Sequence, residues 1–231
     1  MPPFPSSDTI AVIPAMNEAA HIGRLVREVL QQGCQVWVID DGSQDATALE
    51  AEKAGARVIR HPENRGKGMA IRTAIGEFLR TTASHIIFLD ADGQHDPSHI
   101  PAFLDTVRKT GASIVLGNRM DNAAHMPAVR RLTNRFMSWV VSRLAGQRIP
   151  DSQCGYRLLS RDFAMAFQPT TSHFDLESEM LAQAGRQKRR IVFVPIQTIY
   201  AGEASHIHPI RDAFRFLRFL FRQWTRRRSK T

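Results

Sequence analysis

Two aspartates on either side of one small residue, Asp90 and Asp92 around Ala91, directly follow the apolar segment IIFL at residues 86–89. Two carboxylates held where a strand gives way to a loop can bind a hard divalent cation, which also takes oxygens from a diphosphate. Gln94 offers a further oxygen ligand. Asp and Gly also end strands as ordinary turn formers, so the pair alone leaves both interpretations open.

A second acidic segment, IDDGSQDAT at residues 39–47, follows another apolar run. Its adjacent acids, Asp40 and Asp41, can accept hydrogen bonds from the ribose or the base of a nucleotide. Helix capping is the alternative, because Ser43 or Asp45 can bond the free amides of the next helix. Both interpretations place polar side chains where a strand is predicted to end.

A third polar segment, HPENRGKG at residues 61–68, contains Arg65 and Lys67 and precedes a helix expected from about Met69. Free amides at a helix start, together with a lysine, suit a phosphate. The segment alone is a weak signal, because it does not match GxxxxGK[ST] and no GxGxxG follows any predicted strand.

The elements that must hold these segments are short runs of Val and Ile separated by stretches with helical periodicity. The order through residue 116 is βαβαβαβαβ, which predicts an α/β fold with a mostly parallel central sheet flanked by helices. Ligands of such sheets bind beyond the carboxyl ends of the strands, so four polar loops should meet at one rim. The predicted strands lie at residues 10–13, 36–39, 58–59, 86–89 and 114–116.

The pattern after residue 116 is weaker, and no internal repeat or low-complexity segment is present. It predicts an irregular segment, DSQCGYR, at residues 151–157 and one further strand at 191–194. Helices are predicted near 127–145, at 176–185 and from about 209 to 226.

The composition predicts one globular domain over residues 1–231, because 43% of the residues are hydrophobic and no linker divides the chain. Two distant cysteines form no disulfide framework, the N-terminus does not match a signal peptide, and no apolar run is long enough to span a bilayer. We therefore expect a cytoplasmic protein, either soluble or peripheral at the cytoplasmic face of the membrane.

The formal net charge of +9 is concentrated at residues 127–148, 186–190 and 211–230. This indicates an anionic partner, although a basic face that only meets solvent is the alternative. On the helix predicted at 209–226, aromatic and aliphatic residues gather opposite arginines, as in a helix that lies on a membrane surface. Packing of this apolar face on the domain core is the alternative. Phe136, Trp139 and Val140 give the 127–148 helix a similar character.

Several motifs together resemble the inverting family 2 glycosyltransferases of the GT-A fold, and among them the group that includes the dolichyl-phosphate mannose and glucose synthases. The resemblance covers about residues 10–210, and it implies a catalytic core at about 8–205. Its motifs are IPAMNEAAHI, IDDGSQDAT, NRGKG, LDADGQHDP, GNR, DSQCGYR, FDLESEM and VPIQTIYAGEASHI.

The resemblance implies a role for each matching residue. Asp90, Asp92 and Gln94 match the site that binds Mg²⁺ or Mn²⁺ and the diphosphate. Arg119, Arg130 and Arg131 fall where the lipid-phosphate synthases hold the acceptor phosphate, and Asn134 stands near a position where that group often has Ser. The residues implied to contact the nucleotide-sugar are Pro14, Ala15, Asn17, Glu18, Asp41, Lys67, Asp90 and Ala91.

The acceptor decides whether the reaction needs a general base. A hydroxyl acceptor must lose a proton, whereas a phosphate monoester is already largely anionic at neutral pH. With a lipid phosphate no base is required, and catalysis would rest on the cation and on arginines that place the incoming oxygen. The residues predicted to be catalytic are Asp92, Arg119, Arg130 and Asp151. With a hydroxyl acceptor, the candidate bases are Asp151, Glu177 and Glu179, whose alternative role is to orient their neighbours.

The resulting prediction is transfer of a hexose from a UDP- or GDP-sugar to a polyprenyl- or dolichyl-phosphate-type acceptor. A glycosyltransferase for a non-lipid hydroxyl and a phosphatase of the haloacid dehalogenase type are the alternatives. The phosphatase places its DxD on the first strand, whereas here the motif follows the fourth. A nucleic-acid-binding module is disfavoured, because it leaves the acidic loops unexplained.

Overall fold

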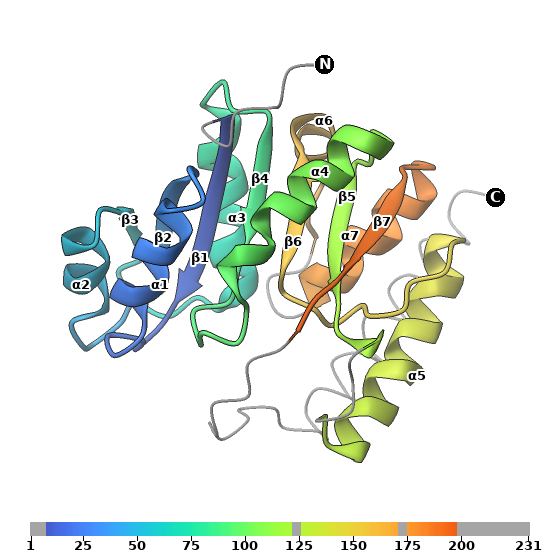
Figure 1. The fold of residues 1–231 in the computed structure, drawn as a ribbon, viewed down its shortest axis with the longest axis horizontal. Helices are drawn as coiled ribbons and strands as arrows, with labels where there is room; N and C mark the ends of the chain where they lie inside the picture. The colour runs from blue at the N-terminus through green and yellow to red at the C-terminus, as the bar shows by residue number, and fades with distance from the viewer. Residues whose placement is uncertain (1–7, 122–125, 171–174, 198–231) are drawn as a thin grey trace. The chain divides into compact units, whose positions relative to one another are not determined.

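The computed structural model describes residues 8–121, 126–170 and 175–197. They form a seven-stranded sheet with the strand order β3-β2-β1-β4-β6-β5-β7 and helices on both faces (Figure 1). The described residues lie within one compact unit. The single-domain organisation of the whole chain stays a prediction, and the helix predicted at 209–226 lies outside the described residues.

The first half of the sheet confirms the alternation predicted from the sequence. Strands β1, β2, β3 and β4 pair in parallel, with Val12 opposite Trp37 and Phe88. Asp45, one of two predicted caps, accepts a hydrogen bond from the Thr47 amide at the start of α2. The elements are β1 (Thr9–Ala15), α1 (Ile22–Leu30), β2 (Gln35–Asp40), α2 (Thr47–Lys53), β3 (Arg57–Arg60), α3 (Lys67–Leu79) and β4 (His85–Phe88).

The second half contains a strand that the sequence analysis did not predict. β6 (Arg157–Ser160) inserts between β4 and β5 and runs antiparallel to both, with Leu159 opposite Ile86 and Ile114. Four residues are too short for periodicity to identify. The predicted helices near 127–145 and 176–185 and the strand at 191–194 are confirmed. The elements are α4 (Ile100–Thr110), β5 (Ile114–Asn118), α5 (Ala128–Ala145), α6 (Arg161–Ala166), α7 (Asp175–Arg186) and β7 (Ile191–Pro195).

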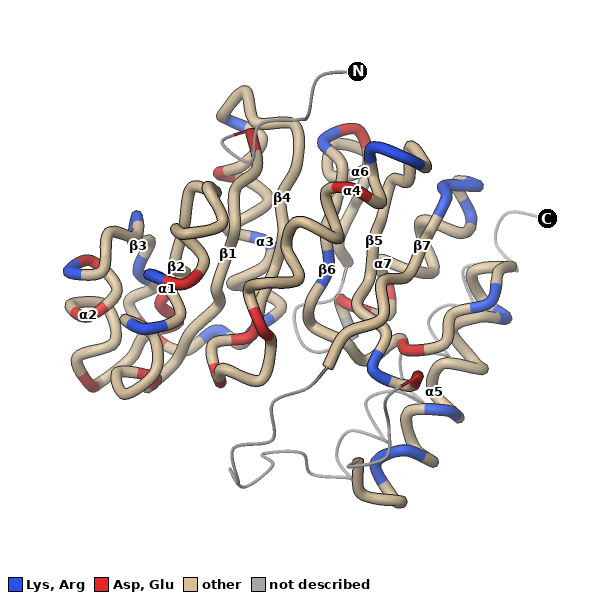
Figure 2. Tube along the Cα trace, viewed as in Figure 1, with Lys and Arg blue, Asp and Glu red and all other residues tan. Residues whose placement is uncertain are grey.

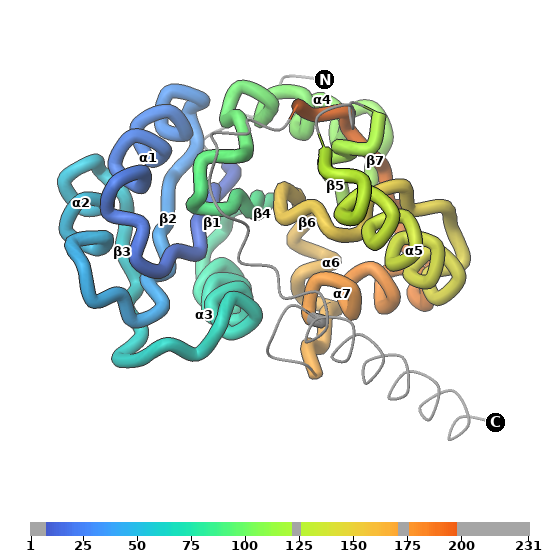
Figure 3. Tube along the Cα trace, turned by 90° about the horizontal axis from the view of Figure 1, so that it is seen from below, coloured from blue at the N-terminus to red at the C-terminus, as the bar shows by residue number. Residues whose placement is uncertain are grey.

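The helices divide between the two faces of the sheet, as the end-on view shows (Figure 3). Helices α1 and α4 cover one face, whereas α3, α6 and α7 cover the other. Figure 3 views the molecule from the edge of the sheet at which the parallel strands β1, β2 and β4 end. The polar loops that follow these strands are therefore brought together at that edge.

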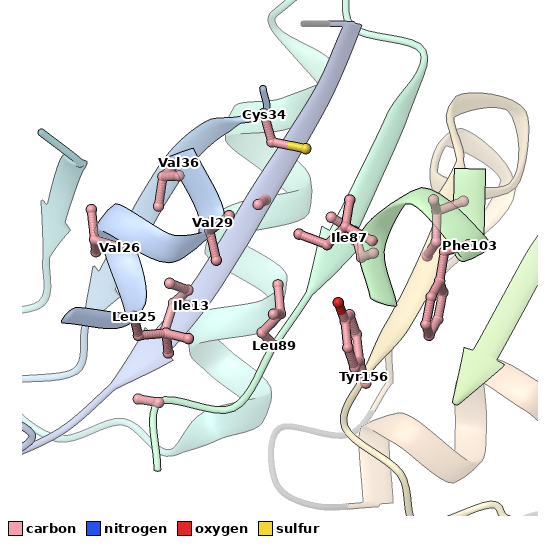
Figure 4. Packing of buried hydrophobic residues seen from close by; sticks show 14 of the residues in the cluster. Ile13, Leu25, Val26, Val29, Cys34, Val36, Ile87, Leu89, Phe103 and Tyr156 are labelled. Carbon is pink, nitrogen blue, oxygen red and sulfur yellow. The ribbon is translucent and has the colours of Figure 1, made fainter. Parts of the chain in front are cut away.

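The core on the α1 side explains why the first helix forms where it does. Leu25, Val26 and Val29 are buried on one side of α1 and pack toward Ile13 of β1 and Val36 of β2 (Figure 4). Each side chain of this size contributes about 1.5–3 kcal/mol when it leaves water. The helix thus fixes β1 and β2, and with them the loops that follow.

A second part of the core lies beneath the DxD loop. The rings of Phe103 and Tyr156 stack at a centroid distance of 4.5 Å (Figure 4). The His95 ring also stacks with Tyr156, at a centroid distance of 5.1 Å. The second contact holds His95, in the loop after β4, against Tyr156, which directly precedes β6. None of the helices in the described ranges is both long and apolar enough to cross a bilayer.

Candidate active site

The first two polar loops are joined by hydrogen bonds between backbone and side chains. Asn17, in a left-handed conformation at φ 56°, donates its amide to Ser43 Oγ at 2.9 Å and accepts from the Gln44 amide at 2.9 Å. The Glu18 amide donates to Thr47 Oγ1 at 2.7 Å. Ser43 therefore holds the first loop and does not cap α2, so this predicted capping residue was wrong.

Asp41 connects the second loop to the third. Its carboxylate accepts from the amides of Arg65 at 3.0 Å and Gly66 at 2.7 Å, and it lies 2.7 Å from Nδ1 of His61. Gly42 adopts φ +77°, and a Cβ there would come 2.5 Å from the backbone carbon of Glu63. Only glycine permits this packing of one loop on the next. Asp41 thus shapes the wall next to the predicted nucleoside position.

Pro14 and Ala15, also predicted to contact the nucleotide, end β1 beside these two loops. The carbonyl oxygen of Ala15 accepts a hydrogen bond from the Asp41 amide at 2.9 Å. The loops after β1 and β2 therefore begin side by side, and their conformations are fixed before any ligand binds.

The fourth loop carries Asp90, Ala91, Asp92 and Gln94 away from the end of β4. The side chain of Asp92 accepts from the Gln94 amide at 3.0 Å, which closes a tight turn. The Asp90 amide donates to Nδ1 of His95 at 3.2 Å, so the proton of a neutral His95 ring stands on Nε2. Burial lowers the pKa of His95 to about 4, despite the Asp90 carboxylate nearby. His95 is thus a neutral side chain that fixes the turn.

Lys67, the first residue of α3, links the third loop to the fourth. Its ammonium group donates to Asp90 Oδ1 at 2.5 Å and lies 3.3 Å from Glu177 Oε1. Burial favours the neutral acid, but the Lys67 charge holds the pKa of the Asp90 carboxyl well below its ordinary value. Asp90 is consequently an anion that already has a cationic partner. The four predicted loops do meet at one rim.

Gly155 gives the Asp90 carboxylate the room it occupies. A Cβ on residue 155 would overlap both carboxylate oxygens, since it would stand 2.5 Å from Oδ1. The sequence pattern predicts an irregular segment at this residue and no role for it. A Gly before a strand is a weak signal in sequence, and only the approach of β6 to β4 reveals its importance.

The donor set of this loop fits a divalent cation that is shared with a substrate. Asp90 and Asp92 supply two carboxylates, and Gln94 can add an amide oxygen. Within the described residues, no group of three or more His, Cys, Asp or Glu side chains is arranged to hold a metal. Mg²⁺ typically binds one or two carboxylates and completes its shell with water and substrate phosphates. The ammonium group of Lys67 already gives Asp90 a positively charged partner from the protein itself.

A second cluster lies deeper, where Arg119 follows β5. Its guanidinium binds Asp151 through Nε to Oδ2 at 2.7 Å and Nη2 to Oδ1 at 3.0 Å. Asn134 of α5 donates to Asp151 Oδ1 at 2.9 Å and accepts from Ser138 Oγ at 2.9 Å. Asp151 is fully buried. Burial opposes its ionisation, but Arg119 and the hydrogen bonds hold the pKa of this carboxyl below its ordinary value.

Arg130 is brought to the same side of α5 as this cluster by helical spacing. It precedes Asn134 by one turn, and the buried stripe of the helix continues through Ser138 and Val141. Arg130 and the adjacent Arg131 are half-buried. The placement of Arg130 next to the Arg119 cluster is what a phosphate-binding role requires, and that role stays a prediction.

Arg157 was not identified from the sequence. It is fully buried at the start of β6, donates to the carbonyl oxygens of Cys154 at 2.5 Å and Glu177 at 3.2 Å, and lies 3.5 Å from the Glu177 carboxylate. A buried arginine is unusual unless it is paired. It ties β6 to α7 and thereby positions Glu177 beside Lys67.

Comparisons with known proteins identify the family and the fold of this chain. Residues 10–166 match the model of the family described as glycosyl transferase family 2. The fold matches the crystal structure of glucosyl-3-phosphoglycerate synthase from Mycobacterium tuberculosis in complex with Mn²⁺, uridine diphosphate and phosphoglyceric acid. The TM-score is 0.72 at 19% identity, over 93% of this chain and 78% of that one. The fold is GT-A, and the chain belongs to glycosyltransferase family 2.

Among the similar proteins are two that are named for transfer to dolichyl phosphate. One is the UDP-N-acetylglucosamine–dolichyl-phosphate N-acetylglucosaminyltransferase of Methanococcus voltae, which is 29% identical over 82% of this chain and 84% of its own length. The other is the dolichyl-phosphate hexose transferase of Haloferax volcanii, which is 29% identical over 85% of each chain. The enzyme class is therefore glycosyltransferase and not phosphatase.

Proposed function

We propose that this enzyme transfers a hexose from a UDP- or GDP-sugar to a polyprenyl- or dolichyl-phosphate acceptor, with inversion at the anomeric carbon and with Mg²⁺ or Mn²⁺. The relatives that act on dolichyl phosphate support the acceptor class. The neighbouring structure that contains Mn²⁺ and uridine diphosphate supports the donor and the cation. Membrane contact through 127–148 and 209–226, at the cytoplasmic face, belongs to the same proposal.

The contacts of the three candidate bases support a phosphate acceptor over a hydroxyl acceptor. Asp151 is buried and bonded to Arg119, and Glu179 is buried and accepts hydrogen bonds from Thr170 and Gln183. Glu177 lies between the cationic groups of Lys67 and Arg157. Burial opposes ionisation of Asp151, but Arg119 and the hydrogen bonds hold its pKa below the ordinary value, so this carboxylate is a poor proton acceptor. An acceptor that arrives as an anion, such as a phosphate monoester, needs none of them.

The residues then act through position and charge. Arg130 holds the acceptor phosphate in line with the anomeric carbon, together with any guanidinium donor of Arg119 that is not bound to Asp151. Asp151 and Asn134 keep Arg119 in place. The acceptor oxygen forms a bond to that carbon while its bond to the diphosphate oxygen breaks. The electron pair leaves on the nucleoside diphosphate, and no proton has to move. A cation held by Asp90, Asp92 and Gln94 would neutralise charge on the departing diphosphate.

The test is incubation of the full chain with radiolabelled UDP-glucose or GDP-mannose, a divalent cation and polyprenyl phosphate, followed by extraction into organic solvent. Label in the organic phase is the expected result, and it should depend on both the cation and the lipid phosphate. Polyprenol without the phosphate is the matched control. Label that remains aqueous for every pair, or equal labelling of the free alcohol, would contradict the lipid-phosphate acceptor.

A further inference from the structure

Helix α5 carries an apolar surface that is exposed to solvent. Val129, Leu132, Phe136 and Trp139 are 72%, 71%, 57% and 57% exposed, and their spacing places them along one side of the helix. We call these four residues the α5 stripe. They are the majority of the large hydrophobic residues that are exposed in the described part of the chain. Contiguous exposed apolar residues of this kind mark an interaction surface.

The charge around the α5 stripe is positive. Arginines follow the whole length of α5 (Figure 2), and the Arg143 guanidinium lies 5.4 Å from the ring centroid of Trp139. No ion pair joins Arg135 or Arg148 to a carboxylate anywhere in residues 8–121, 126–170 or 175–197. The surface therefore presents cations that lack partners within the described protein.

A cavity of about 420 Å³ opens beside this stripe, between α5 and the segments at 120–121 and 148–150. Arg135, Trp139 and Arg148 line it, with Met120 and Ile149 as apolar neighbours. We call it the α5 cavity. Trp139 belongs to both the cavity and the stripe, so an occupant of the cavity would continue directly onto the apolar surface.

The cationic hydrogen-bond donors of the cavity are the guanidinium groups of Arg135 and Arg148. Ser142 Oγ already donates to the Ser138 carbonyl at 2.6 Å, and Ser138 Oγ donates to Asn134. One acid, Asp121, also lines the cavity, and its carboxylate accepts from the Asn118 amide at 2.8 Å. The balance of two arginines against one partnered carboxylate favours an anion, and guanidinium groups match the geometry of phosphate.

We propose that the α5 cavity binds the phosphate headgroup of an anionic phospholipid while the α5 stripe lies at the acyl boundary of the same membrane. The proposal rests on the membrane contact of the 127–148 helix that is part of the proposed function, and it adds a bound lipid that is not the acceptor. A Trp at the interface, aliphatic side chains below it and arginines at the headgroup level form a membrane-surface arrangement. Arg135 follows Arg130 by five residues, which is roughly 140° around the helix axis, so the two arginines project in different directions. A bilayer supplies both the phosphate and the apolar phase that the surface requires.

The experiment measures flotation of the full chain with vesicles of phosphatidylcholine, with and without added phosphatidylglycerol, in the absence of donor and acceptor. Arg135→Gln/Arg148→Gln should lower binding to the phosphatidylglycerol vesicles by at least about tenfold. Arg24→Gln/Arg80→Gln removes the same two charges from α1 and from the end of α3, and it should change binding less than threefold. Leu132→Ser/Phe136→Ser should weaken binding to both vesicle types.

Three results would overturn the proposal. Equal losses for the two arginine pairs would mean that net charge alone attracts the membrane. Full binding by the Leu132→Ser/Phe136→Ser variant would remove the apolar contact. Displacement of the wild-type protein by inorganic phosphate at matched ionic strength would mean that the cavity takes free phosphate. Unchanged melting temperatures establish that each variant is folded, and because no substrate is present, a failure of the proposed transfer reaction leaves this outcome unaffected.

Discussion

Gly155 and Asp90 touch so closely that residue 155 can carry no side chain while Asp90 keeps its position, since an ideal Cβ would stand 2.5 Å from Oδ1. Gly155→Ala should therefore displace the Asp90 carboxylate and lower the apparent affinity for Mn²⁺ by about 10–100-fold. The measurement is a Mn²⁺ titration of nucleoside diphosphate release.

Gly76→Ala is the matched control for this change. No atom lies within 4 Å of a Cβ at residue 76 of α3, so the variant should keep its activity and gain about 0.5–1 kcal/mol of stability. An unaltered Mn²⁺ titration for Gly155→Ala would show that Asp90 takes no part in binding the cation.

Asp92→Ala should reduce transfer by at least about 100-fold while the melting temperature stays within a few degrees. The side chain is half-buried in a surface loop, so its loss removes a charge but leaves no core cavity. The assay is release of nucleoside diphosphate, with Asp105→Ala on α4 as the control. Full activity of the wild-type protein in buffer stripped of divalent cations would contradict a metal-binding role for Asp92.

Lys67→Met should destabilise the cation-free protein by about 1–3 kcal/mol, because it leaves Asp90 without its lysine partner and Glu177 with Arg157 alone. Added Mn²⁺ should then raise the melting temperature of the variant more than that of the wild type, since the ion restores the missing charge. Thermal unfolding with and without Mn²⁺ measures both effects. If Mn²⁺ raised the melting temperature of the variant and of the wild type equally, the Lys67 ammonium group and the ion would not occupy the same position beside Asp90.

Asp151→Asn should abolish a pH-dependent part of the stability. The folded-state pKa of Asp151 lies below its unfolded value, so its contribution is fully present above the unfolded pKa of about 3.9 and is lost as pH falls through the folded pKa. The difference in free energy of unfolding between wild type and variant should be about 3–5 kcal/mol at neutral pH and should shrink below pH ~4. Denaturant unfolding across this range measures it. A difference that does not change with pH would refute the ion pair as its cause.

Arg130→Gln should raise the KM for polyprenyl phosphate by roughly 10–100-fold and leave the KM for the donor unchanged, because one charge-assisted phosphate contact is lost. Steady-state kinetics with each substrate varied in turn separates the two. Arg80→Gln, at the exposed end of α3, is the control. A change in the donor KM alone would place Arg130 at the nucleotide-sugar.

The sequence predicted the first half of the fold well, because its strands and helices carry strong local patterns. The stripe of α1 and the apolar run before Asp90 each specify one element and one direction. Each polar loop follows a strand, so the parallel order alone brought Asp41, Lys67 and Asp90 to one rim.

The second half depends on contacts that no local pattern encodes. The pairing of β6 with both β4 and β5 brings Gly155 to Asp90 and Arg157 to Glu177, and neither contact follows from residue spacing. Asp151 was a candidate base because of its type and motif. Its burial against Arg119 and Asn134 became visible only when β5, α5 and the segment before β6 were placed together.

The strand order also governs how the chain acquires its structure during synthesis. Strand β5 ends at Asn118, but its two hydrogen-bonding neighbours are β6 and β7, which follow about 40 residues or more later. A ribosome that adds about 5–20 residues per second leaves β5 with exposed edges for several seconds. A nascent chain that stops near residue 120 consequently lacks a finished sheet, even though its first four strands can already pair.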